Sequence, residues 1–248
     1  MAKQSTVKDL KSRLMDGLKV LTGEGVLTGS GHLSVRIQGT DTFFINPRYA
    51  GILADVKDIC TVDLSGKRVS GSAPIPLEIS IHTTVYRARP EVMSVLHCHA
   101  RYAVMVGLLD SGLIPFHREA RAFEDGVPIF PDSNGINNND LAQRMVDSLG
   151  KHSAVFLRGH GIVAAGRSVE GTCVTAIQLE RACADQLLMS SSTTIKPLTE
   201  EYTTRIPGKE ENPYRAWPFL LYKHKVRSRQ AIKSITKKMI KTLWPNEG

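Results

Sequence analysis

The chain has 248 residues, 42% of them hydrophobic, so it can bury the core of one large domain, and no apolar run reaches the ~20 residues that span a bilayer. The N-terminus lacks the apolar block of a signal peptide, and the four cysteines form no Cys-x-x-Cys pair, so we expect free thiols and a cytoplasmic protein. The formal charge of +8 does not indicate nucleic-acid binding, because eight Lys or Arg and a single acid fall in residues 223–248 and leave the rest nearly neutral.

Helical and extended patterns alternate through the first half of the chain. Apolar residues at helical spacing predict two helices, over 5–22 and 77–88, and Pro90 marks the end of the second. Short apolar runs bounded by turn formers predict three strands, at 33–37, 42–46 and 58–64. The first two of these strands flank Gly39-Thr40-Asp41, which is typical of a hairpin.

The second half continues in the same alternation. Predicted strands lie at 91–99, 127–130, 153–158 and 162–166. Predicted helices lie at 100–107, 138–149 and 169–188. Strands intermixed with helices indicate a layered α/β domain, and the hairpin-like pairs make its central sheet mixed and largely antiparallel. The polar stretch over 190–213 is rich in turn formers, which predicts a loop or a lid over a site.

The tail, residues 223–248, combines basic charge with an apolar stripe. Its apolar residues recur three and four positions apart, at Ile232, Ile235, Met239 and Leu243. This spacing predicts a basic amphipathic helix that packs on its own or a neighbouring subunit, or else contacts an acidic surface, a membrane or a polyanion. We expect neither nucleic acid nor membrane as a partner, and we divide the chain into a main domain over 1–222 and this tail.

Three histidines and a glutamate form the pattern with the most chemical meaning. His97 and His99 stand at i and i+2 on a predicted strand, so their side chains share one face of the sheet. His160 lies in a glycine-flanked turn, and Glu78 lies one strand-helix unit upstream. A lone histidine is more often structural, but three imidazoles with an open position are typical of a catalytic metal site. Glu78 is then a fourth ligand, a general base, or only a charge favoured by a helix dipole.

The joint spacing of Glu78, His97-Cys98-His99 and the segment RGHGIVAAG around His160 resembles the class II aldolase/adducin family, over about residues 8–190. The resemblance implies a three-layer α/β/α catalytic domain over 1–222, around a mixed sheet. It implies that His97, His99 and His160 bind one divalent ion per subunit, with zinc first and manganese or iron as alternatives, and that Glu78 is the acid/base. It also implies a homotetramer with active sites at the subunit interfaces.

Around this pattern the sequence departs from the sugar-phosphate enzymes of the family. Where they bind phosphate with a Gly-Asn pair and a Thr-Gly turn, this chain has His32 and Pro47-Arg48, so a phosphate nest is poorly supplied. Arg118 stands where those aldolases have a proton-donating tyrosine, and a guanidinium pairs with a carboxylate. We therefore expect a small anionic substrate without phosphate. From the resemblance and these departures from it, we expect Glu78, His32 and Arg118 to act in catalysis and four residues to bind substrate: Ser34, Arg48, His117 and Tyr214.

The Gly-His-x-Ser form and the Arg-Ala-Trp motif at 215–217 look more like the branch of this superfamily that contains decarboxylases of hydroxylated aromatic dicarboxylates. We therefore predict a divalent-metal-dependent carbon-carbon lyase, a decarboxylase of a small hydroxylated aromatic carboxylate or dicarboxylate, in which the metal stabilises the carbanion and Glu78 moves the proton. The alternatives are a class II aldolase that cleaves a sugar phosphate or hydroxyketone, an iron-dependent oxygenase on the same fold, and a non-catalytic adducin-like binding module.

Overall fold

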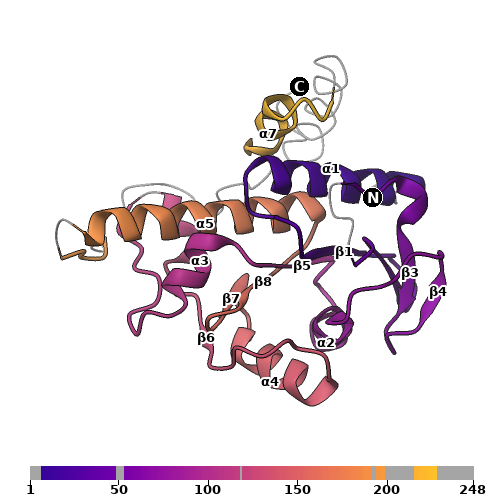
Figure 1. Cartoon of the computed structure of the whole chain (residues 1–248), viewed down its shortest axis with the longest axis horizontal. Coiled ribbons are helices and arrows are strands. Elements are labelled where there is room, and N and C mark those ends of the chain that lie inside the picture. Colours follow the sequence, from indigo (N-terminus) through magenta and orange to yellow (C-terminus); the bar gives the residue numbers. More distant parts are fainter. Residues whose placement is uncertain (1–6, 49–52, 118, 192–193, 199–214, 228–248) are drawn as a thin grey trace, which may run out of the picture.

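The computed structural model describes residues 7–48, 53–117, 119–191, 194–198 and 215–227, and its centre is one eight-stranded sheet (Figure 1). The strands are β1 His32–Arg36, β2 Thr42–Ile45, β3 Cys60–Asp63, β4 Arg68–Ser70, β5 Ser94–Cys98, β6 Ile129–Phe130, β7 Ala154–Leu157 and β8 Gly161–Gly166. The helices are α1 Val7–Gly23, α2 Ile79–Ala88, α3 Arg101–Val106, α4 Asn139–Leu149, α5 Val169–Ser190 and α7 Trp217–Lys223, with 3-10 turns at Val56–Asp58 and Glu119–Phe123.

The strands follow the order β4-β3-β2-β1-β5-β8-β7-β6 across the sheet. Neighbouring strands are antiparallel except β6 and β7, which run parallel, so the predicted mixed, largely antiparallel sheet is confirmed. The sequence does not predict β4, because its three residues are all exposed and show no apolar alternation. Strand β5 is buried along its whole length, as expected of a strand with helices on both sides.

Helices cover both faces of the sheet and make three layers (Figure 1). α1, α3 and α5 share one apolar core with the sheet, whereas α2 and α4 share a second core on the opposite face. α1 buries the leucines whose spacing predicted it: Leu10, Leu14, Leu18 and Leu21. The side chains of Asn138 and Ser168 begin α4 and α5 by accepting hydrogen bonds from backbone N–H groups of the first turn. The predicted α/β/α architecture is therefore confirmed.

The described C-terminal part packs on the α1 side. Trp217 is 3% exposed and belongs to the same apolar core as α1 and α5. Residues 228–248, which hold most of the predicted tail helix, lie outside the described residues, so that helix and the domain boundary at 222 stay predictions. Of the predicted loop over 190–213, the structure describes 190–191 and 194–198, where the N–H of Leu198 donates to the carbonyl of Pro115 at 3.0 Å.

All four cysteines are unpaired, as the sequence predicts, and the structure buries each of them: Cys60, Cys98, Cys173 and Cys183. Burial raises the pKa of the Cys98 thiol to about 12, so this group stays protonated at neutral pH. Within the described ranges, no helix combines the length and the apolar composition that a bilayer crossing requires.

Glu24, which directly follows α1, ties three segments together. Its side chain is 5% exposed and accepts hydrogen bonds from Arg181 of α5 at 2.7 Å, from Lys223 at the end of α7 at 2.7 Å and from His224 at 2.5 Å. Burial by itself would raise the pKa of Glu24, but the hydrogen bonds from these donors outweigh it and lower the pKa to about 2. Glu24 therefore holds α7 against α1 and α5.

Replacing Glu24 by Gln should lower the free energy of unfolding at neutral pH by about 1–3 kcal/mol, because the three donors lose a charged, buried acceptor. Since folding lowers the Glu24 pKa from 4.5 to about 2, the carboxylate's contribution is complete above pH 4.5 and is lost as the pH falls through about 2. Urea unfolding at several pH values should show the difference between wild type and Glu24→Gln narrowing below pH 4.5. Asp125→Asn, which changes an exposed carboxylate, is the control. An equal loss of unfolding free energy in both variants would contradict this prediction.

Candidate metal centre

Antiparallel pairing brings the predicted histidines to one end of the sheet. His97 lies on β5, and His99 directly follows the last residue of that strand. The turn between β7 and β8 carries His160. Gly161 lets this turn approach β5, because a Cβ at that position would collide with the backbone oxygen of Cys98. Segments that are about 60 residues apart in sequence thus present their imidazoles to one another.

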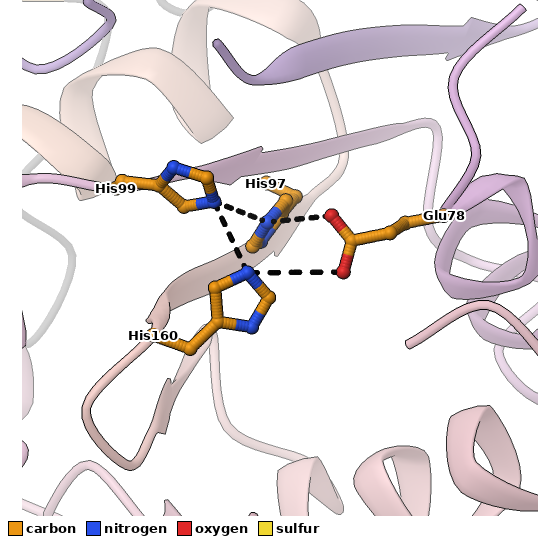
Figure 2. Close-up of side chains that lie close together, drawn as sticks. All are labelled: Glu78, His97, His99 and His160. Carbon is orange, nitrogen blue, oxygen red and sulfur yellow. Dashed lines mark hydrogen bonds and ion pairs between the residues drawn. The ribbon is translucent and has the colours of Figure 1, made fainter. Parts of the chain in front are cut away.

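The imidazoles of His97, His99 and His160 converge through their Nε2 atoms, with Glu78 beside them (Figure 2). The Nε2 atom of His99 lies 3.2 Å from that of His97 and 3.1 Å from that of His160. Glu78 Oε2 lies 3.2 Å from His97 Nε2, and Glu78 Oε1 lies 3.8 Å from His160 Nε2. All four ligand atoms lie within 4.8 Å of one another. The structure therefore brings together the four residues that the sequence pattern singles out.

This convergence fits a divalent cation. A hydrogen bond can pair two ring nitrogens through one shared proton, but a third nitrogen at the same point is then left without a hydrogen-bond donor. A metal ion, in contrast, accepts the lone pairs of all three nitrogens. His97 Nδ1 lies 3.0 Å from the carbonyl oxygen of Ile162, to which we assign a donated hydrogen bond, so its Nε2 carries the lone pair. Burial, reinforced by the neighbouring rings, lowers the pKa of His99 to about 4 and lowers that of His160 as well. Both rings are then neutral, which is the form that binds metal.

Glu78 directly precedes α2, and its side chain turns toward the histidines rather than capping the helix (Figure 2). Its Oε1 accepts a hydrogen bond from the N–H of Ile136 at 2.7 Å, and its Oε2 faces His97 at 3.2 Å and His32 at 3.8 Å. Burial would raise the pKa of Glu78, but the interaction with His32 and the hydrogen bond from the N–H of Ile136 outweigh it and lower the pKa below its usual range. An anchored, ionised carboxylate therefore stands beside the three imidazoles.

His32 and Ser34 lie on β1, next to the cluster, and both are buried. His32 is opposite His97 in the register of β1 and β5. The Oγ atom of Ser34 lies 2.7 Å from His82 Nδ1 and 2.7 Å from the hydroxyl of Tyr86, so it is engaged by side chains of α2. The sequence analysis missed His82 and Tyr86. A signal was available, because Glu78, His82 and Tyr86 follow one another at i, i+4 and i+8 and so share one face of α2.

Of the other predicted site residues, Arg48 and His117 lie in the described part of the chain. Arg48 is half-buried and follows β2 at the end of the sheet where β1 begins with His32. His117 faces Asp185 of α5, with 3.4 Å between its Nε2 and a carboxylate oxygen. Arg118 and Tyr214 lie outside the described residues. The roles of all four in catalysis or substrate binding stay predictions.

Known proteins resemble this chain in sequence and in fold. A 3,4-dihydroxyphthalate decarboxylase from Arthrobacter keyseri is 30% identical over 217 residues, which cover 80% of this chain and 87% of that protein. A 4-hydroxy-3-prenylphenylpyruvate oxygenase/4-hydroxy-3-prenylbenzoate synthase from Streptomyces roseochromogenus subsp. oscitans is 27% identical over 174 residues, which cover 68% of this chain and 62% of that protein. The solved structure of L-fuculose 1-phosphate aldolase from Glaciozyma antarctica PI12 has a TM-score of 0.77 at 23% identity, with 96% of this chain and 95% of that chain covered, and so shows a shared fold.

A family model also matches the chain. Residues 14–187 match the model described as Class II Aldolase and Adducin N-terminal domain. The matched range contains Glu78 and all three converging histidines, together with every strand of the sheet. On the strength of this match, the chain belongs to the class II aldolase and adducin family.

Proposed function

We propose that this protein is a metal-dependent carbon-carbon lyase, specifically a decarboxylase of a small hydroxylated aromatic carboxylate or dicarboxylate. The observation that carries the proposal is the convergence of three imidazole Nε2 atoms and one anchored carboxylate within 4.8 Å. The likeness to a 3,4-dihydroxyphthalate decarboxylase at 30% identity favours this reaction over the others that such a centre can support.

His97, His99 and His160 would hold the cation, with zinc as the first candidate and manganese or iron as alternatives. When bound, such an ion supplies a Lewis acid for the negative charge that develops as the carbon-carbon bond breaks. The protein contributes a preorganised site, because His97 is held by Ile162 and Glu78 by Ile136 before any substrate arrives.

Glu78 is the proposed acid/base. When the substrate loses carbon dioxide, the bonding electron pair stays on the ring carbon, and one proton must take the place of the carboxylate group. The ionised Glu78 can take up a proton from water and deliver it to that carbon, while its hydrogen bond from Ile136 keeps the carboxylate directed at the histidines. His32, beside the same oxygen, assists as a hydrogen-bond donor.

Recognition of the substrate is proposed to rest on cationic side chains. Arg48 lies at the sheet end where His32 begins β1, and a guanidinium binds a carboxylate through two parallel hydrogen bonds. Since His117 faces Asp185 in its own chain, its proposed contact with substrate would be made in a neighbouring subunit. We accordingly propose a homotetramer with interfacial sites, to which Arg118 and Tyr214 would also contribute.

Two other reactions remain candidates for the same centre. The shared fold with L-fuculose 1-phosphate aldolase favours an aldolase, and the likeness to a prenylphenylpyruvate oxygenase favours an iron-dependent oxygenase. Carbon dioxide release, aldehyde release and oxygen consumption separate the three. The presence of all four cluster residues argues against a binding module without catalysis.

Glu78→Gln should lower kcat for carbon dioxide release from 3,4-dihydroxyphthalate by about a hundred- to ten-thousand-fold, because the amide keeps the shape but cannot carry the proton. Metal content should not change. Glu91→Gln, at an exposed acid paired with Arg89, is the matched control and should keep full activity. Turnover of a ketose phosphate by the wild type, without carbon dioxide release from any dihydroxyaromatic acid, would reject the decarboxylase.

The purified protein should hold one divalent ion per chain, measured by plasma mass spectrometry. His99→Ala should lose that ion at a metal concentration that saturates the wild type, because the two remaining imidazoles bind it less tightly than three. Removal of the ion by a chelator should lower the Tm of the wild type, because a ligand that binds only the folded chain stabilises it. His152→Ala, at a histidine whose Nδ1 contacts Gly126, is the control. A full equivalent of metal in His99→Ala would place the ion elsewhere.

A further inference from the structure

A continuous line of buried polar side chains leads from the inside of α2 to Glu78. The Tyr86 hydroxyl lies 2.7 Å from Ser34 Oγ, which lies 2.7 Å from His82 Nδ1. His82 Nε2 lies 2.6 Å from His32 Nδ1, and His32 Nε2 faces Glu78 Oε2 at 3.8 Å. His82 and Ser34 are 0% exposed. The proposed reaction uses only the last two members of this line, Glu78 and His32.

Burial makes such a line costly unless every polar atom is paired. The line lies beside the apolar core that α2 shares with the sheet, which includes Phe43, Val85 and Val95. An unpaired polar group in such a core costs on the order of 1–3 kcal/mol. An aliphatic side chain at position 82 would fill the same space at no such cost. The presence of a second buried histidine therefore calls for a role beyond packing.

The two ends of the line set the direction of its hydrogen bonds. The 2.6 Å contact between His32 Nδ1 and His82 Nε2 holds one proton, which belongs to one ring or the other. Because Glu78 is ionised, its carboxylate can only accept hydrogen bonds, and it favours a proton on His32 Nε2. In a neutral His32 ring the Nδ1 is then unprotonated and carries a lone pair. His82 Nε2 must then donate to His32, and His82 Nδ1 must accept from Ser34.

The far end of the line agrees with this direction. Burial raises the pKa of Tyr86 well above its usual value, so its phenol keeps its proton and can donate it to Ser34 Oγ. The Ser34 hydroxyl has two acceptors in reach, the Val95 carbonyl at 3.4 Å and His82 Nδ1 at 2.7 Å, and the shorter contact favours donation to His82. Every hydrogen bond from Tyr86 to His32 thus points toward Glu78. The opposite direction would aim a bare His32 Nε2 at the carboxylate, which is electrostatically unfavourable.

We propose that His82 is a positioning residue for the metal-dependent reaction, because it donates to His32 Nδ1 and thereby keeps the His32 Nε2–H directed at Glu78. Ser34 and Tyr86 act through His82 by supplying the donor that its Nδ1 accepts. Ser34 therefore serves this line rather than the substrate. The effect of His82 on turnover rests on the proposed function, but the tautomer of His32 does not.

The tautomer is tested on the metal-loaded wild-type protein by nitrogen-15 NMR of its histidines, at neutral pH and without substrate. We expect His32 to carry its proton on Nε2 and not on Nδ1, and His82 to carry its proton on Nε2. Single His→Gln variants at the two positions assign the signals. A His32 ring protonated on Nδ1 alone would overturn the proposal, whatever reaction the enzyme catalyses.

The effect on turnover is tested with two variants of position 82. In His82→Gln the side-chain amide can still donate a hydrogen bond to His32. In His82→Leu the side chain has a similar volume but no hydrogen-bond donor. We expect His82→Leu to lower kcat by about ten- to a hundred-fold, the range typical of losing a hydrogen-bond partner that orients the residues of a metal site, with KM and metal content within about twofold of wild type. His82→Gln should recover most of that loss.

Two results of this comparison would overturn the positioning role. One is a folded His82→Leu protein with wild-type kcat. The other is an equal loss of kcat in both variants, in proportion to the drop in their Tm. That result is expected if His82 contributes packing alone. If the wild type releases no carbon dioxide from dihydroxyaromatic acids, the proposed function fails, and the NMR result still decides whether His82 directs His32.

Discussion

The antiparallel pairing of β5 with β1 on one side and β8 on the other is the constraint on which the whole site depends. In this register His97 lies opposite His32 and Val163. A slip of one residue would turn His97 to the other face of the sheet. Its neighbours Leu96 and Cys98 are buried in the core beneath α1, α3 and α5, so apolar burial on that face holds the register that the chemistry on this face requires.

The two faces of the sheet divide stability from chemistry. On the α1 and α5 side the core is apolar, and ion pairs such as Arg13 with Glu170, at 2.5 Å, lie at its margin. On the α2 and α4 side the core contains buried imidazoles and hydroxyls at 0% to 6% exposure, among them His32, Ser34, His82 and His97. Such groups are tolerated because each finds a partner, and the partners in turn restrict every ring to one orientation.

The fold by itself leaves several carbon-carbon cleavages open, because one metal centre can stabilise more than one kind of developing negative charge. What distinguishes this chain is the surroundings of Glu78. Glu78 and His82 lie one turn apart at the start of α2. This one helix therefore positions both the carboxylate of Glu78 and the His82 ring that directs His32. The resemblance places an asparagine in the sugar-phosphate enzymes where His32 stands, and an asparagine has no tautomer for a donor to select.

The sequence by itself determined the alternation of helices and strands and the largely antiparallel sheet, since periodicity states which face of an element each side chain occupies. It also singled out the four residues of the candidate metal centre, through the strand spacing of His97 and His99 and the family resemblance that added Glu78 and His160. It did not reveal β4, whose exposed residues carry no apolar pattern. It also could not show that His82 meets His32, or that His117 faces Asp185. Periodicity says nothing about which elements become neighbours, and only the packing of α2 against β1 and the pairing of β1, β5 and β8 brought these side chains within hydrogen-bonding distance.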